Sequence, residues 1–324
     1  MIKEELLRIL WDNADRSISG AELARRLSVS RAAVWKAVEQ LREEGYLIES
    51  ATRVGYRLSS HSDVLSAEGI RRRLRTPRLA VEVYPSLDST NNLLKARAAA
   101  GAAEGLVIVA VEQSGGRGRM GRSFYSPPGT GLYLSLLLRP TLPAAEATAL
   151  TACAAVAVAE SIEALSGKAA QIKWVNDVLI DGKKVCGILT EASLGCESGT
   201  LDYAVVGIGV NALLPEGGLP PELQAVAGAV FNTASLPELR CRLAAEILDR
   251  LMGHYAHLAD RRFFNAYKLR SLVLGKAVQV LSPGREPERA EVLDLEENFA
   301  LLVRMGDGSL RHIQSGEVSI RPQA

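Results

Sequence analysis

The spacing of apolar residues changes once along the chain, and this change limits what the chain can fold into. Up to Gly45, apolar side chains recur every three or four residues, as on one side of a helix. From Leu79 onward they form short runs typical of strands, separated by helical stretches. With 324 residues, the chain has room for two or three domains, so we expect a helical module followed by a domain of strands and helices.

Residues 1–60 are predicted to form three helices and a hairpin. Ser19 and Glu22 make a capping box that begins the second helix, and Ser30 caps the third, which ends at Gly45. Two helices joined by so short a turn predict a helix-turn-helix, whose second helix enters the major groove of DNA.

A two-stranded wing is predicted after these helices, from residues 46–49 and 55–58. The formal net charge of the whole chain is only +1, so nucleic-acid binding would need a local basic face. Such a face is present between Glu22 and Glu39, where basic residues occur without an acidic one. A charged, solvated face on an ordinary three-helix unit is the alternative. The predicted DNA-binding residues are Arg25, Arg26, Arg31, Lys36 and, in the wing, Arg53.

Residues 61–78 are predicted to be a linker with one short helix. The run Arg71-Arg72-Arg73 is interpreted as a solvated surface, and no site is assigned to it.

Residues 79–273 are predicted to form a domain with a mixed sheet. Asp181-Gly182 lies between two apolar runs and predicts a two-residue hairpin, so two neighbouring strands must be antiparallel. With helices at about residues 88–101 and 144–165 on one side of the sheet, the class is α+β. Strands are expected at residues 80–84, 106–112, 131–138, 171–174, 178–180, 184–191 and 201–211.

A basic glycine-rich loop follows one of these strands, at residues 113–122. Gly116, Gly118 and Gly121 match the G-x-G-x-x-G pattern of dinucleotide-binding folds, but Pro127-Pro128 prevents the helix that such a loop must open. The loop can place guanidinium groups and backbone amides around an anion. A disordered surface loop is the alternative. Its arginines are Arg117, Arg119 and Arg122.

Two further strands carry unusual residues. Lys184 opens an otherwise apolar strand, so either a structural salt bridge or a contact with a bound phosphate is expected. Gly207 and Gly209 alternate in another strand, which indicates either close approach of a flat group or tight sheet packing.

Residues 274–324 are predicted to form a small closed β-barrel. Asp307-Gly308 is a tight hairpin turn between two of its strands. The strands are expected at residues 277–281, 290–295, 300–304 and 310–314.

Composition excludes several classes of protein. With 48% apolar and 23% charged residues the chain is typical of globular proteins. The longest nearly uncharged stretch, residues 147–159, is shorter than the ~20 residues that cross a bilayer, and the start lacks the apolar region of a signal peptide. We therefore expect a cytoplasmic protein without a membrane span. Its four cysteines, expected to be reduced thiols, are Cys153, Cys186, Cys196 and Cys241.

Six segments, taken in order, resemble the bifunctional biotin-protein ligases, bacterial enzymes that also repress biotin synthesis. The resemblance covers the whole chain. It departs at Val175, where proline is usual, and at Leu213, where a second asparagine is usual. The segments are Asp88-Ser89-Thr90-Asn91, Gln113 with residues 116–122, Lys173-Trp174-x-Asn176-Asp177, residues 182–189, Gly207-x-Gly209-x-Asn211 and Ser315-Gly316-Glu317-Val318-Ser319.

The resemblance implies a winged helix-turn-helix, a catalytic domain of the biotin/lipoate ligase type and an SH3-like C-terminal barrel. It implies that biotin and ATP form biotinyl-5'-AMP, and that biotin passes to a lysine of the biotin carboxyl carrier protein of acetyl-CoA carboxylase. Operator DNA and a homodimer of the adenylate-bound protein are the other implied partners. Two rivals remain open: a non-catalytic biotin-sensing regulator and a lipoate-protein ligase.

The resemblance also implies roles for single residues. Lys184, Arg117 and Arg119 would act in catalysis, and Asp177 would hold Mg²⁺. A carboxylate that attacks a phosphate independently requires nearby cations, because both reactants are anions. The implied biotin-binding residues are Ser89, Thr90, Asn91, Gln113, Gly116, Arg117, Gly118, Arg119 and Lys184. The implied ATP-binding residues are Arg119, Arg122, Phe124, Asn176, Asp177 and Asn211.

Overall fold

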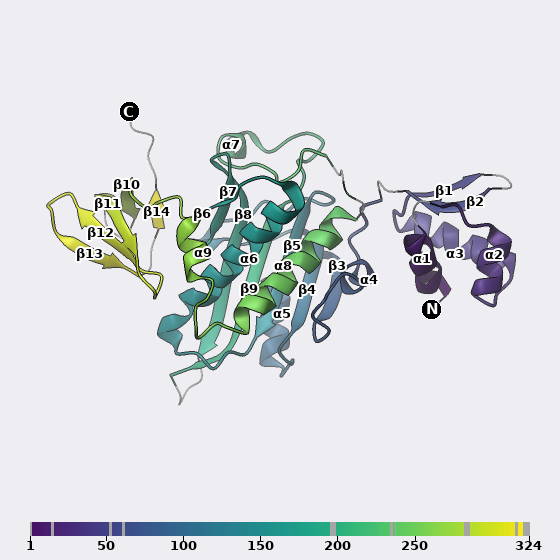
Figure 1. The fold of residues 1–324 in the computed structure, drawn as a ribbon, viewed down its shortest axis with the longest axis horizontal. Coiled ribbons are helices and arrows are strands. Elements are labelled where there is room, and N and C mark those ends of the chain that lie inside the picture. The colour runs from purple at the N-terminus through teal and green to yellow at the C-terminus, as the bar shows by residue number, and fades with distance from the viewer. Residues whose placement is uncertain are drawn as a thin grey trace. The chain divides into compact units, whose positions relative to one another are not determined.

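The computed structural model describes residues 2–13, 16–51, 54–59, 62–194, 199–233, 236, 238–281, 286–314 and 317–319. The chain divides into two compact units (Figure 1). The first comprises Met1–Leu74 and Phe231–Ala245, and the second comprises Arg75–Val230 and Glu246–Ala324. The division into four domains, with boundaries at residues 60, 78 and 273, stays a prediction, since compactness groups the chain differently.

The first unit contains the predicted winged helix-turn-helix. The hydroxyl of Ser19 accepts a hydrogen bond from the amide of Glu22, and that of Ser30 accepts one from Ala33, both at 3.1 Å. These caps fix where the second and third helices begin. The strands of the wing are antiparallel. The elements are α1 (Ile2–Asp12), α2 (Gly20–Arg26), α3 (Arg31–Glu43), β1 (Ile48–Ala51) and β2 (Gly55–Leu58).

After the wing, a short helix, α4 (Ala67–Arg71), leads to a buried ion-pair cluster. Arg72 and Arg73 both pair with Glu238, and the Arg73–Glu238 distance is 2.7 Å. The Glu238 side chain is only 3% exposed, and this burial raises its pKa. Two guanidinium groups therefore compensate one buried carboxylate. The interpretation of these two arginines as solvated surface is wrong, because both bind a buried carboxylate. That carboxylate lies 166 residues from Arg72 and 165 from Arg73 in sequence, so the local pattern could not reveal it.

The second unit is built on a mixed seven-stranded sheet in the order β3-β4-β5-β9-β8-β7-β6. Only β3 and β4 are parallel among these neighbouring pairs. Between β7 and β8, Asp181 and Gly182 have φ values of 49° and 75°, which confirms the predicted hairpin turn. The strands are β3 (Ala80–Leu87), β4 (Leu106–Gln113), β5 (Gly131–Leu138), β6 (Gln171–Lys173), β7 (Asp177–Ile180), β8 (Lys183–Leu194) and β9 (Leu201–Asn211).

Helices cover both faces of this sheet, so the prediction that they lie on one side is wrong. Adjacent residues of a strand point to opposite faces. On β8, Glu191 binds Lys95 of α5 (Thr90–Ala99), whereas Thr190 hydrogen-bonds to Thr151 of α6 (Thr148–Ser166) at 2.8 Å. The helix-forming runs were predicted correctly, but a local pattern does not say which face a helix covers.

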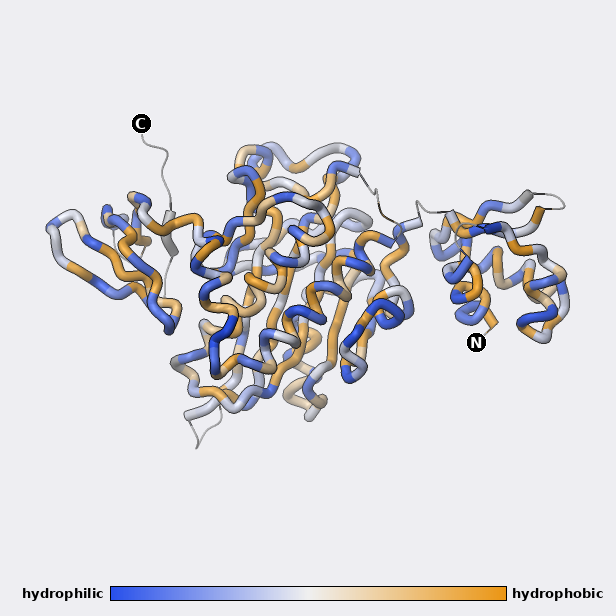
Figure 2. Tube along the Cα trace, viewed as in Figure 1, coloured by the Kyte–Doolittle hydropathy of each residue, from blue (hydrophilic) through white to orange (hydrophobic). Residues whose placement is uncertain are grey.

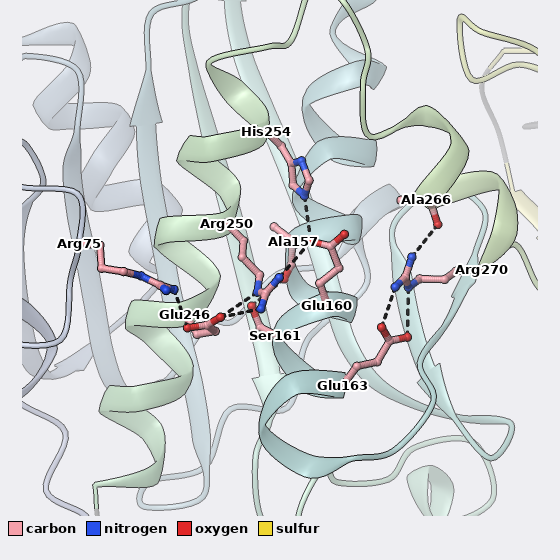
Figure 3. A network of polar contacts seen from close by, with 10 residues as sticks. All are labelled: Arg75, Ala157, Glu160, Ser161, Glu163, Glu246, Arg250, His254, Ala266 and Arg270. Carbon is pink, nitrogen blue, oxygen red and sulfur yellow. Dashed lines mark hydrogen bonds and ion pairs between the residues drawn. The ribbon is translucent and has the colours of Figure 1, made fainter.

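The second half of α8 (Leu239–Tyr255) lies along α6, and ion pairs join the two helices (Figure 3). Glu160 of α6 contacts His254 at 2.9 Å and Arg250 at 3.5 Å. The hydrogen bond from His254 lowers the pKa of Glu160. Glu163 of α6 binds Arg270 at 2.6 Å, which ties in the end of α9 (Phe264–Leu269).

Among the described helices, α6 alone is long and apolar enough to cross a membrane. It has 19 residues and a mean hydropathy of 1.5, but 72% of it is buried within the protein. Figure 2 shows hydrophobic residues along this helix and the central strands, and β5 is buried at every position. The apolar character of α6 therefore fits a core helix packed on a sheet.

Cys153, Cys186 and Cys241 are buried free thiols, as predicted, while Cys196 lies outside the described residues.

The C-terminal part of the second unit is an antiparallel sheet in the order β13-β12-β11-β10-β14. The sheet confirms the predicted strands, and β14 was missed. No described pairing joins β13 to β14, so closure into a barrel stays a prediction. The strands are β10 (Ala277–Leu281), β11 (Glu288–Leu295), β12 (Leu301–Met305), β13 (Leu310–Ile313) and β14 (Glu317–Ser319). The remaining short helices are η1 (Arg119–Gly121), η2 (Ala144–Glu146) and α7 (Pro221–Gln224).

Candidate active site

Two adjoining pockets lie in the second unit, and the predicted ligand-binding residues gather in them. The inner pocket spans about 340 Å³ and the outer cleft about 680 Å³, both with the open mouth included. Residues of the inner pocket alone include Ser89, Thr90, Asn91, Gln113, Gly207 and Gly209. Residues of the outer cleft alone include Gly118, Arg119, Arg122, Lys173, Asn176, Asp177 and Lys184. Both are lined by Arg117, Phe124, Gly187 and Leu189.

The phenyl ring of Phe124 lines both pockets and lies against the sheet. A Cβ atom on Gly209 would lie 2.6 Å from this ring, and one on Gly187 would lie 3.2 Å from it. Tyr133 contacts the ring edge-on, with the centroids 6.4 Å apart. The predicted close approach of a flat group to Gly209 is therefore confirmed, and that group is the protein's own side chain.

The inner pocket has a polar wall that hydrogen bonds hold in place. The Thr90 amide donates to Oε1 of Gln113 at 2.9 Å, and Nε2 of Gln113 donates to the Ser126 hydroxyl at 3.1 Å. The buried hydroxyl of Ser135 lies 2.8 Å from Oγ1 of Thr90. Ser89 is the N-cap residue of α5, but its side chain makes no capping hydrogen bond. Its hydroxyl thus stays available to a ligand.

Asn91 lies in this wall with both N–H groups of its side-chain amide engaged. Its Oδ1 atom is 2.5 Å from the Ser135 hydroxyl, and its Nδ2 atom donates to the Leu189 carbonyl and to Oε2 of Glu191 at 3.2 and 2.8 Å. An amide nitrogen has two N–H groups, and both are used. Asn91 therefore shapes the pocket. Glu191, which is held by Lys95 at 2.5 Å, was not found from the sequence.

A carboxylate in the middle of a strand was the signal that could have revealed Glu191. It follows the apolar run at the start of β8 and is flanked by Thr190 and Ala192. A charged residue half-buried on a sheet needs a partner, so its presence predicts a polar network nearby.

The basic loop folds back on itself over the junction of the pockets. The Phe124 amide donates to the Gly116 carbonyl at 2.9 Å, and the Gly118 amide donates to the Arg122 carbonyl at 2.7 Å. A Cβ atom on Gly116 would lie 2.4 Å from the Phe124 carbonyl oxygen, so only glycine fits there. No α-helix follows within the described segment 114–130, which confirms that this is not a dinucleotide-binding loop.

Lys184 projects into the outer cleft from β8. Its Nζ atom lies 2.7 Å from Oδ1 of Asp177, and the side chains are 35% and 21% exposed. The structural salt bridge is thus confirmed, and a contact with a bound anion stays a prediction. Nη1 of Arg119 donates to Oδ1 of Asn176 at 3.1 Å, and this bond links the loop to the opposite wall.

The outer cleft is strongly cationic. Asp177 is the single carboxylate among its lining residues, against five basic side chains. Such a cleft favours a polyanion such as a nucleotide triphosphate. The basic residues are Arg117, Arg119, Arg122, Lys173 and Lys184.

The C-terminal sheet holds one wall of the cleft. The indole N–H of Trp174 donates to the Phe299 carbonyl at 2.8 Å, and the Tyr267 hydroxyl donates to the Val175 carbonyl at 3.2 Å. The peptide bond between Trp174 and Val175 is cis. These contacts fix the backbone directly before Asn176.

Two predicted ligand-binding residues, Gly116 and Asn211, line neither pocket. The side-chain amide of Asn211 donates to the Gly228 carbonyl at 3.0 Å. No group of three His, Cys, Asp or Glu side chains occurs among the described residues, so Asp177 is not part of a larger acidic cluster there. Because Mg²⁺ is usually held by one or two carboxylates together with substrate phosphates, the assignment of Asp177 to Mg²⁺ stays a prediction.

The predicted DNA-binding side chains lie in the first unit. Arg25, Arg26, Arg31 and Lys36 are exposed, and Arg26 pairs with Glu22 at 2.5 Å. Arg53 lies outside the described residues.

Comparison with known proteins identifies three regions. The model described as "HTH domain" matches residues 3–57, "Biotin/lipoate A/B protein ligase family" matches 83–211, and "Biotin protein ligase C terminal domain" matches 273–321. The bifunctional ligase/repressor BirA of Bacillus subtilis is 38% identical over 235 residues, 72% of each chain. The Escherichia coli protein of the same name is 34% identical over 193 residues, 60% of this chain and 59% of that one. The biotin protein ligase of Aquifex aeolicus, solved with biotin and ATP, has a TM-score of 0.62 and 27% identity, covering 75% of this chain and 99% of that one.

Proposed function

The chain belongs to the family of the bifunctional ligase/repressor BirA, and we propose that its two pockets activate and transfer biotin while its first unit binds operator DNA. The observation that supports this most is the direct junction of a small, hydrogen-bonding pocket with a cationic cleft. Arg117 and Phe124 line both, so two ligands can meet there.

Biotin fits the inner pocket by its chemistry. The cyclic urea of biotin has both N–H and C=O groups, which match the polar side chains of Ser89, Thr90 and Gln113. Its carboxylate would extend past Phe124 to Arg117. The dithiolane ring of lipoate has no such groups and would leave this polar wall unpaired, so the pocket favours biotin over lipoate.

ATP would occupy the outer cleft with its α-phosphate next to the biotin carboxylate. A carboxylate oxygen attacks the α-phosphorus, the bond to the bridging oxygen breaks, and pyrophosphate leaves. The amine of a carrier lysine then attacks the acyl carbon and releases AMP. Arg117, Arg119 and Lys184 offset the repulsion between the anions and stabilise the charge that grows on the phosphoryl oxygens. Any Mg²⁺ would arrive with the ATP phosphates.

Mass spectrometry tests the proposal against a non-catalytic biotin sensor. The protein is incubated with ATP, biotin and a biotin carboxyl carrier domain. An enzyme leaves a covalent biotinyl group on one carrier lysine, whereas a sensor leaves the carrier mass unchanged. Adding excess lipoate tests the other rival, since only a lipoate ligase would transfer it instead.

The hydrogen bond between Arg119 and Asn176 predicts that the basic loop acts as a lid over the adenylate. We expect Arg119→Gly to release biotinyl-5'-AMP early, so that bystander proteins become labelled on exposed lysines. Blotting with streptavidin after adding a non-carrier protein measures this. Labelling confined to the carrier domain, at wild-type levels, would contradict the lid.

Glu191 is predicted to be a positioning residue for the inner pocket, because it holds Asn91. We expect Glu191→Ala to raise KM for biotin roughly 10-fold, with kcat and the KM for ATP little changed, because it leaves one buried N–H unpaired. Glu191→Gln should restore most of the affinity by accepting the same bond. Lys95→Met, which removes only the ion pair, is the control. Equal effects of all three variants, or a loss confined to kcat, would contradict this role.

A second copy of the chain and the carrier protein are proposed as partners because the chain belongs to the ligase/repressor family. We infer that adenylate binding favours a homodimer, which would place two copies of α3 on a palindromic operator. The acceptor would be the carrier protein of acetyl-CoA carboxylase. Action on this protein and on operator DNA supports the proposal that the chain works in the cytoplasm.

A further inference from the structure

The third helix of the first unit exposes a tryptophan to which no role has been assigned. Trp35, in α3, is 58% exposed, while the other two tryptophans of the chain, Trp11 and Trp174, are 7% and 3% exposed. A tryptophan ring contributes most to stability or binding when it is buried against another surface. Its indole N–H is a hydrogen-bond donor and needs an acceptor there.

The residues around Trp35 indicate what kind of partner would bind over its ring. It lies one helical turn after Arg31 and directly before Lys36, both exposed, while Val34 and Val38 on the other side of α3 are fully buried in the core. The face therefore presents a flat apolar ring between two cations.

The nearest acidic residue does not cancel this charge. Glu39, which follows Trp35 by four residues, binds Arg42 at 2.7 Å. A strongly cationic face with an aromatic ring at its centre is complementary to duplex DNA, which combines phosphate charges with apolar and acceptor groups on its base edges. This charge complementarity selects DNA as the occupant.

We propose that Trp35 reads base sequence in the major groove, with its ring against a thymine methyl group, while Arg31 and Lys36 contact phosphates. This inference rests on the proposed DNA-binding function and adds separate roles for the residues of α3. The cations supply affinity for any duplex, and Trp35 supplies the preference for one sequence.

The test compares a preferred duplex with a shuffled one. Duplexes are selected from a random-sequence pool with the full-length wild-type protein in the presence of biotin and ATP. The enriched duplex and its shuffled version are then titrated with wild type, Trp35→Ala and Lys36→Ala over a range of salt concentrations. Thermal melting of each variant checks its fold.

Each variant has a distinct expected pattern. Trp35→Ala should weaken binding to the enriched duplex by roughly 10-fold to 100-fold and leave the shuffled duplex and the salt slope nearly unchanged. Lys36→Ala should weaken both duplexes alike and reduce the salt slope by about 1. Equal weakening of both duplexes by Trp35→Ala would overturn the inference.

Fluorescence provides a direct readout, because Trp35 is the exposed tryptophan of the three. The enriched duplex should protect wild-type emission from acrylamide quenching, and Trp35→Phe should abolish this protection. Quenching that is unchanged by the bound duplex would also overturn the inference. If the wild type binds no duplex even at low salt, the DNA-binding function itself fails, and this outcome is distinct from a loss of sequence preference alone.

Discussion

Replacing Lys184 with alanine should slow the formation of biotinyl-5'-AMP by roughly 10²-fold to 10³-fold while the protein remains folded. The ammonium group of Lys184 extends from β8 into the outer cleft, next to the residues shared with the inner pocket. There it would offset the repulsion between carboxylate and α-phosphate and stabilise the charge that develops in the transition state. Single-turnover measurement of adenylate formation at saturating biotin and ATP isolates this step.

Folding should tolerate the change because the ion pair of Lys184 with Asp177 is partly exposed. Pairs of this kind contribute roughly 0–1 kcal/mol, against a total stability of about 5–15 kcal/mol. Lys183→Ala is the matched control: Lys183 is exposed, adjacent in sequence and outside both pockets. A normal rate in Lys184→Ala, or an equal loss in the control, would remove the assigned role.

Replacing both Arg31 and Lys36 with glutamate should abolish binding to duplex DNA. Both side chains are exposed on α3, and the double change reverses the charge of the face that would meet the phosphates. Because neutralised phosphates supply most non-specific affinity, reversed charges repel the duplex at any sequence. Fluorescence anisotropy of a labelled duplex at low salt measures the loss.

A matched double variant separates a local effect from that of net charge. Lys276→Glu with Arg289→Glu changes the charge equally on exposed residues of the C-terminal part of the second unit. This variant should bind DNA nearly as well as wild type. Unchanged affinity of the α3 double variant at low salt would contradict the assignment of this face to DNA.

Features that depend on neighbours in sequence were predicted from the sequence. The caps at Ser19 and Ser30 and the turn at Asp181-Gly182 occur as expected, because a side chain and an amide three residues apart, or two residues with positive φ, suffice to form them. The strands β5 and β9 have the predicted bounds.

Features that depend on distant residues were not predicted. Arg72 and Arg73 are paired with Glu238, and the Asn91 side chain donates to Glu191, although each of these partners is distant in sequence. Hydrophobic spacing contains no information on such pairings. For the same reason it did not reveal that α5 and α6 lie on opposite faces of the sheet.

The candidate site shows the same division. Family resemblance implied most of the pocket residues, but not their arrangement around Phe124, which both pockets share. Nor did it predict that Asn211 would lie outside the pockets. Such arrangements follow from the packing of Phe124 on Gly187 and Gly209, which joins three separate segments of the chain.

Exchange of labelled pyrophosphate into ATP tests the central claim most directly, because it reports the reversible attack of a carboxylate on the α-phosphate in the cationic cleft. We expect exchange with the wild-type protein that requires biotin and is lost in Lys184→Ala. Exchange that proceeds without biotin, that requires lipoate instead, or that is absent altogether would contradict the account.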